Sequence, residues 1–79
     1  MRAFVLIKVG PGELGSWMKV VAEKIQKISG IVQVHEVFGR YDIIVQLEAN
    51  SLEEHSRVVS DKLRHVPGVM STETLVASS

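Results

Sequence analysis

The sequence predicts an α+β domain with a ferredoxin-like βαββαβ fold, in which two helices cover one face of a four-stranded antiparallel sheet. Apolar runs with strand character alternate with stretches of helical periodicity in that order. The two halves of the chain also repeat each other with a shift of 38 residues, so that Val21 matches Val59 and Gly30 matches Gly68. Such a duplication of a split βαβ unit is typical of this fold class.

The first half supplies a strand, a helix and a second strand. Residues 3–9 are apolar and rich in β-branched side chains, which predicts a strand buried on both faces. Residues 13–29 have helical spacing, and Gly30 follows where a helix-terminating glycine belongs. Residues 31–38 form the next expected strand. The apolar stripe of the helix consists of Leu14, Trp17, Met18, Val21, Ile25 and Ile28.

The second half repeats this plan. Residues 41–48 predict a strand, and a helix opens at Ser51, which has Glu54 at the spacing of a capping box. Pro67-Gly68 ends this helix, and residues 69–77 predict the last strand. The expected buried stripe of the second helix consists of Leu52, Ser56, Val59, Leu63 and Val66. No linker or low-complexity segment interrupts the chain, so we expect a single domain over residues 1–79.

The repeat also assigns the two faces of the sheet, because side chains alternate along a strand. Phe4, Leu6 and Ile44 are expected on the face that the helices leave open, at the centre of the sheet. An apolar centre with a polar rim on an uncovered sheet indicates an interface, so we expect the domain to dimerise through this face. The side chains expected to face the helices are Val5, Ile7, Val9, Ile43, Val45 and Leu47.

Composition supports association. A chain of 79 residues buries only roughly 60–65% of its unfolded surface, so one copy alone is marginally stable. The chain has no cysteine to form a disulfide, yet 46% of its residues are hydrophobic, which favours an oligomer. Nine basic and nine acidic residues cancel, and this neutrality predicts no direct binding of nucleic acid. No apolar run is long enough to span a membrane, so we expect a cytoplasmic protein with no membrane partner.

Few side chains are of a type and spacing that would indicate catalysis or metal binding. His55 and His65 lie ten residues apart on one helix, about 15 Å along its axis, so they cannot share a metal, and we expect all three histidines at the surface. Ser51 is expected to cap its helix and Trp17 to pack in the core. Phe4 is the only aromatic residue expected on the open face, which disfavours an RNA-binding sheet. We therefore expect no metal, no cofactor and no catalytic residue.

The segment from Val37 to Val45 stands apart from this background. It predicts a strand, a tight turn at Gly39 and a second strand, with Gly39 supplying a positive φ. Asp42 places a carboxylate at the start of an otherwise apolar strand. Two interpretations follow: Asp42 caps the turn or pairs with Arg40, or it meets the ammonium group of a small zwitterion at a subunit seam while turn amides bind the carboxylate.

These residues carry a family resemblance. The segment 39–44 (Gly-Arg-Tyr-Asp-Ile-Ile), together with Pro67-Gly68-Val69 and Thr72-Glu73-Thr74, resembles the effector-binding domain of the leucine-responsive Lrp/AsnC regulators, also called the RAM domain. The resemblance extends over nearly the whole chain. It implies sheet-to-sheet dimers that assemble into rings, commonly of eight subunits, with an amino acid bound between dimers. The ligand contacts that it implies are Gly39, Arg40, Tyr41, Asp42, Thr72 and Thr74.

The chain departs from the full-length regulators because Met1 leads directly into the first strand, without a helix-turn-helix domain. It therefore resembles stand-alone family members that keep only the effector domain, and full-length Lrp/AsnC regulators become candidate partners through mixed assembly. The face assignment directs Thr72 and Thr74 toward the helices. Two alternatives share the topology: an ACT-like regulatory module, and a small cofactor-independent dimeric monooxygenase whose cavity Trp17 and His55 would flank.

Overall fold

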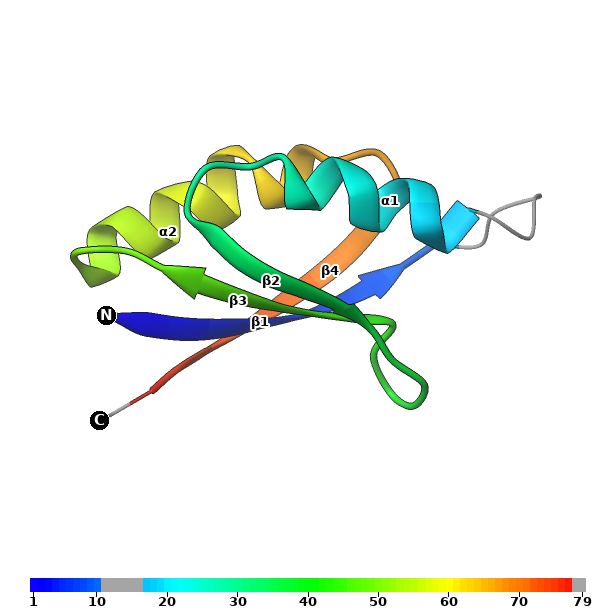
Figure 1. Ribbon diagram of the computed structural model, residues 1–79, viewed down its shortest axis with the longest axis horizontal. Coiled ribbons are helices and arrows are strands. Elements are labelled where there is room, and N and C mark those ends of the chain that lie inside the picture. Colours follow the sequence, from blue (N-terminus) through cyan, green and yellow to red (C-terminus); the bar gives the residue numbers. More distant parts are fainter. Residues whose placement is uncertain (11–16, 78–79) are drawn as a thin grey trace.

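Four antiparallel strands form one sheet, and both helices cover the same face of it (Figure 1). This computed structural model describes residues 1–10 and 17–77. The strand order is β2-β3-β1-β4, so β1 and β3 are central, as the ferredoxin-like prediction requires. The elements are β1 Arg2–Val9, α1 Trp17–Gln26, β2 Ile31–Glu36, β3 Ile43–Glu48, α2 Leu52–Asp61, the short 3₁₀ helix η1 Leu63–His65, and β4 Val69–Val76.

The pairing of β1 with β3 confirms the predicted faces of the sheet. Val5 lies opposite Val45 and Ile7 opposite Ile43, and all four side chains are fully buried beneath the helices. The intervening residues point the other way and are only half-buried, so the expectation that β1 is buried on both faces is wrong for the single chain. The core beneath the helices consists of Val5, Ile7, Val9, Val21, Ile25, Ile43, Val45, Leu47, Val58, Val59 and Leu63.

The helices confirm most of their predicted stripes. In α1, Val21 and Ile25 are buried, while Leu14 and the start of the predicted helix lie outside the described residues. Ser51 caps α2 by accepting a hydrogen bond from the Glu54 backbone N–H at 3.1 Å, as the capping-box spacing predicted. The carboxylate of Glu54 accepts in turn from the backbone N–H of Asn50 at 2.9 Å.

The face of helix α2 that is buried differs from the predicted stripe. Leu52 and Ser56 are exposed, whereas His55 and Val58 are buried together with Val59. The prediction of a surface histidine at position 55 is therefore wrong. The reason is a hydrogen bond: the His55 Nε2–H donates to the Met1 carbonyl oxygen at 2.8 Å, which holds the imidazole inside the fold. Because a carbonyl oxygen only accepts, Nε2 carries the proton of this bond, and Nδ1 is a buried nitrogen without a described partner.

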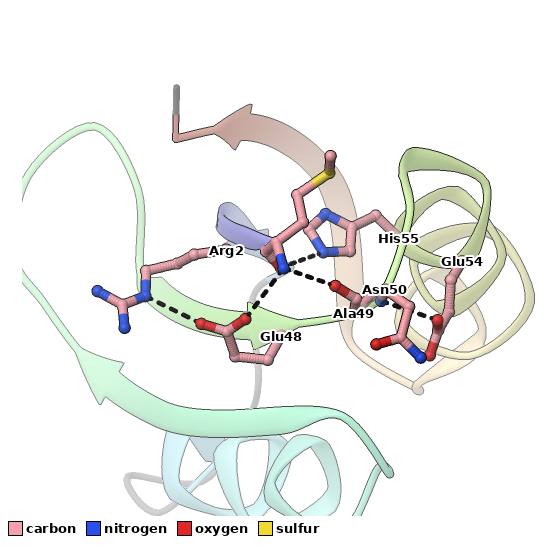
Figure 2. Close-up of polar contacts among 7 residues, drawn as sticks. Arg2, Glu48, Ala49, Asn50, Glu54 and His55 are labelled. Carbon is pink, nitrogen blue, oxygen red and sulfur yellow. Dashed lines mark hydrogen bonds and ion pairs between the residues drawn. The ribbon is translucent and has the colours of Figure 1, made fainter. Parts of the chain in front are cut away.

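The N-terminal end of β1 is held by a small polar network around His55 (Figure 2). The Met1 ammonium donates to the Ala49 carbonyl at 2.8 Å and lies 3.5 Å from the Glu48 carboxylate. The other oxygen of Glu48 accepts from Arg2 Nε at 3.1 Å. These contacts join the ends of β1 and β3 to the start of α2, and so complete the two-layer packing at this end of the sheet.

The connection between β2 and β3 is longer than the predicted tight turn. The strands end at Glu36 and begin again at Ile43, which leaves a loop over residues 37–42. A hydrogen bond from the Val37 N–H to the Asp42 carbonyl at 2.9 Å closes the loop at its base. Gly39 has the predicted positive φ, at 143°. The loop projects beyond the sheet on the side away from the helices (Figure 1).

Both repeat-related glycines adopt left-handed conformations, with φ of 97° at Gly30 and 100° at Gly68. At Gly68 the space is also restricted, because a Cβ atom would lie 2.8 Å from Val21 Cγ2 and 2.9 Å from Trp17 Cζ2. Trp17 is fixed there by its Nε1–H, which donates to the Gly10 carbonyl at 3.2 Å. In the described part of the chain, neither helix is long and apolar enough to cross a membrane.

We predict that Gly68→Ala destabilises the fold more than Gly30→Ala. The two residues have nearly equal φ, so both variants carry the same left-handed strain of about 1–2 kcal/mol. A Cβ atom at Gly30 would lie 3.3 Å from Leu47 Cδ1, a contact that a small shift relieves, whereas the approaches of 2.8 and 2.9 Å at Gly68 require the core to move, at a further cost of about 1–3 kcal/mol. Urea unfolding followed by far-UV circular dichroism measures the difference in the free energy of unfolding between the two variants. Equal stabilities would show that the side chains around Trp17 rearrange to accept the methyl group without loss of stability.

A second prediction concerns Glu48. Its hydrogen bond from Arg2 lowers the pKa of the carboxyl group below its ordinary value of 4.5. The folded state therefore gains stability from this carboxylate above pH 4.5, and loses it as the pH falls through the lowered pKa. Glu48→Gln should reduce the thermal midpoint slightly at pH 7, because the pair is solvent-exposed, and should match the wild type near pH 3. A constant difference at both pH values would contradict this account.

Candidate ligand-binding loop

The loop of residues 37–42 holds Asp42 in a fixed position at the edge of the sheet. Strand β3 begins at Ile43, opposite Ile7, so the backbone N–H of Val9 lies beyond the ladder. Asp42 makes two hydrogen bonds to this end of β1. Its own N–H donates to the Ile7 carbonyl at 2.9 Å, and its Oδ2 accepts from the Val9 N–H at 2.8 Å. Asp42 thus caps the end of β1, and the structure shows no ion pair between it and Arg40 among the described residues.

The carboxylate of Asp42 retains binding capacity. Oδ2 is used by Val9, whereas no described residue hydrogen-bonds to Oδ1. The side chain is half-buried, so it is shielded from solvent on one side only. Within the described residues, the backbone N–H groups of Gly39 and Arg40 likewise have no hydrogen-bond partner. One acceptor oxygen and the N–H groups of Gly39, Arg40 and Tyr41, which have no partner among the described residues, therefore lie within four consecutive residues.

Tyr41 connects the loop to the far side of the sheet. Its hydroxyl donates to Glu73 Oε2 on β4 at 2.5 Å, across the intervening strand β1. Glu73 lies opposite Leu6, which places it on the open face. The hydrogen bond to Glu73 is the main cause that raises the pKa of Tyr41 above 10.0, since the ionised phenolate could not donate it.

The two threonines implied by the family resemblance lie elsewhere. Thr72 is opposite Ile7 and Thr74 opposite Val5, so both side chains face the helices, as the alternation of the strand predicted. Thr74 lines a groove between α2 and β4 rather than the loop. Within one chain the structure therefore brings Tyr41 together with Glu73, the residue between the two threonines. Sequence reasoning missed this contact, because the length of the loop between the second and third strands was not known.

The open face carries the expected apolar centre. Phe4, Leu6 and Ile44 alternate with the buried residues of β1 and β3 and are half-buried in the single chain. Leu75 extends this surface on β4, where it lies opposite Phe4 with half of its surface exposed. Phe38, at the projecting loop, is completely exposed. The apolar surface and the candidate loop are thus adjacent features of the same uncovered side.

Grooves on the single chain lie away from this loop. A groove of about 480 Å³ runs between the end of α1 and the outer face of α2, and one of about 270 Å³ lies between α2 and β4. Neither is lined by a residue of the loop 37–42. In residues 1–10 and 17–77, no cluster of His, Asp and Glu side chains is suited to hold a metal ion.

The pair of residues suggested for an enzyme cavity is not brought together. Trp17 donates to Gly10, just beyond the C-terminal end of β1, whereas His55 donates to Met1 at its N-terminal end. The eight residues of β1 separate these two points by about 26 Å. Trp17 and His55 therefore belong to opposite ends of the core, and the monooxygenase-like arrangement of these two side chains is wrong.

The βαββαβ order, with both helices on one face of the sheet and an apolar face left open, defines the chain as a ferredoxin-like α+β domain. Residues 2–79 match the family described as "Lrp/AsnC ligand binding domain", and the chain belongs to this family. An uncharacterized HTH-type transcriptional regulator of Pyrococcus furiosus is 44% identical over 75 residues, covering 95% of this chain and 49% of the relative. The chain thus spans about half the length of the curated relatives it matches.

Solved structures agree with this fold. A protein of Thermus thermophilus superposes with a TM-score of 0.85 at 31% identity, and the match covers 99% of this chain and 92% of that one. Escherichia coli AsnC gives a TM-score of 0.85 at 18% identity, covering 99% of this chain and 50% of AsnC. A transcriptional regulator of Neisseria meningitidis, solved as a complex with L-Met, gives 0.78 at 16% identity, covering 98% and 50%. The last two likenesses show the fold alone.

Proposed function

We propose that this chain is a non-enzymatic amino-acid sensor of the Lrp/AsnC type. It dimerises through the open sheet face, the dimers assemble into a ring, and the bound amino acid is held at the loop 37–42 between subunits. Through this assembly it modulates transcription regulators, including full-length members of its own family. We place it in the cytoplasm, where such regulators act.

The observation that carries the ligand proposal is the half-used carboxylate of Asp42. Its Oδ2 is fixed by the Val9 N–H, while no described residue donates a hydrogen bond to Oδ1. An α-ammonium group satisfies that oxygen with a charge-assisted hydrogen bond. The free N–H groups of Gly39 and Arg40 are the corresponding donors for an α-carboxylate. The family to which the chain belongs is described as a ligand binding domain, which supports a small-molecule ligand at this loop.

A thermal-shift screen of the twenty amino acids, read beside native mass spectrometry, tests the proposal directly. A ligand that binds only the folded state raises the midpoint in a concentration-dependent way. We expect at least one amino acid to do so, and the mass spectra to show an even-numbered oligomer. A flat response to all twenty amino acids at millimolar concentration would count against the sensor function.

Asp42→Asn should weaken the binding of the amino acid that the screen identifies by at least about tenfold, or 1.4 kcal/mol. The amide oxygen still accepts from the Val9 N–H, so the fold and assembly remain, while the negative charge that pairs with the ammonium is lost. Truncating one member of a partly desolvated ion pair costs about 2–5 kcal/mol, which sets the upper range. Isothermal titration calorimetry measures the change.

Asp61→Asn is the matched control, because Asp61 is an exposed carboxylate at the end of α2, remote from the loop. It should bind like the wild type. If Asp42→Asn also binds like the wild type, Asp42 serves only to cap β1. If it loses assembly rather than affinity, Asp42 is an interface residue.

Leu6→Asp should convert the oligomer into monomers or prevent folding. Leu6 lies at the centre of the open face, where burial of such a side chain contributes about 1.5–3 kcal/mol, and a charge there cannot be desolvated without a partner. Sedimentation velocity at micromolar concentration gives the size. Ile44→Asp tests the neighbouring position in the same way.

Leu52→Asp is the control for this experiment. Leu52 is 55% exposed at the first residue of α2 on the helical side, where an acidic residue is favourable. It should leave both size and stability unchanged. A wild-type protein that sediments as a monomer, or a Leu6→Asp variant that retains the native size, would exclude the open face as the interface.

A further inference from the structure

The outer part of the loop 37–42 has few contacts of its own. Phe38 is completely exposed, and a Cβ atom at Gly39 would meet nothing within 4 Å. Arg40 is exposed as well. Backbone hydrogen bonds hold the base of the loop at Val37 and Asp42 only. Between these ends, the contact that the structure records from the loop to another element is the hydrogen bond from Tyr41 to Glu73.

The geometry of that contact makes it a restraint on the whole loop. Tyr41 follows β2 and precedes β3, while Glu73 belongs to β4 at the opposite edge of the sheet. The bond therefore spans β1 and ties the loop to a strand with which it shares no ladder. The backbone of Glu73 is held by its regular pairing with Leu6, so its carboxylate extends from an ordered strand.

We propose that Glu73 is a positioning residue: through the Tyr41 hydroxyl it holds the Gly39-to-Asp42 segment in the conformation that receives the ligand. The role rests on the proposed function in one respect, namely that the loop binds an amino acid. The restraint on Tyr41 is independent of any ligand. A pre-ordered loop binds better because less conformational freedom is lost when the ligand arrives.

The ionisation behaviour of Tyr41 agrees with this geometry and supplies a probe. The Glu73 hydrogen bond and its negative charge both raise the pKa of Tyr41, while the adjacent Arg40 acts in the opposite direction. The open face also carries Lys8 of β1, opposite Ser71, and His35 of β2, opposite Ile44, and Asp42 follows Tyr41 in the chain. Tyr41 is the only tyrosine of the chain, so its titration is observed without interference.

The first measurement is the absorbance titration of Tyr41 at 295 nm in the intact protein. We expect a midpoint above 10.0 in the wild type, and a return toward 10.0 in Glu73→Ala. Glu73→Gln, which keeps an acceptor oxygen but loses the charge, should fall between them. Glu36→Gln is the matched control, because it removes one exposed carboxylate from the end of β2, and should leave the midpoint at the wild-type value. Equal midpoints in the wild type and Glu73→Ala would overturn the proposal.

The second measurement is the backbone mobility of the loop, by heteronuclear relaxation of the Gly39 and Arg40 amides. Tyr41→Phe removes only the hydroxyl, and should increase the mobility of these two amides while those of Val37 and Asp42 stay ordered. The thermal midpoint should change little, because the contact lies on the surface. Unchanged relaxation in Tyr41→Phe would also overturn the proposal, since the loop would then be ordered without Glu73.

Binding of the amino acid found in the screen separates this inference from the proposed function. We expect Tyr41→Phe and Glu73→Ala, each of which removes the hydrogen bond, to weaken it by about three- to tenfold, the effect of one hydrogen bond. If no amino acid binds the wild type but the titration and relaxation results hold, the sensor function fails and the restraint stands. If binding is tight and unaffected by either substitution, the sensor function stands and the positioning role is refuted.

Discussion

The register between β1 and β3 is the constraint on which the rest of this structure depends. With Val5 opposite Val45 and Ile7 opposite Ile43, every second side chain of both central strands is directed beneath the helices. A slip of one residue would move that apolar set to the open face and expose it. The same register directs Phe4, Leu6 and Ile44 to the uncovered side. One pairing therefore determines both the core of the subunit and the surface available to another copy.

The candidate site is a consequence of where this pairing stops. The ladder ends at Ile43, one residue after Asp42, and the Val9 N–H beyond it is satisfied by a side chain instead of a strand. The loop before β3 is thus hydrogen-bonded to the sheet at Asp42, while its residues from Phe38 to Arg40 are exposed. Its polar groups lie next to an apolar surface that one subunit cannot cover. This neighbourhood is the reason for proposing a ligand site between subunits at the loop.

The side of the sheet that the helices cover differs from the open face, because two of its side chains hydrogen-bond to backbone carbonyls inside the fold. His55 and Trp17 are both tied to backbone carbonyls at the two ends of β1, and each closes one end of the core. At the Trp17 end, Gly68 permits the close approach of the indole, which a side chain at that position would prevent. These residues account for the stability of the two-layer packing. They leave the open face and its loop as the part of the chain where function is expected.

The sequence by itself determined the fold class, the central position of β1 and β3, both faces of the sheet, the Ser51 cap and the left-handed glycines, because each depends on local periodicity or on the internal repeat. It also identified Asp42 as an unusual carboxylate. The tertiary structure decided the rest. Whether His55 is buried depends on a carbonyl 54 residues away, and the partners of Asp42 and Tyr41 lie on β1 and β4. Contacts between distant residues depend on loop length and helix rotation, which periodicity within a single element does not encode.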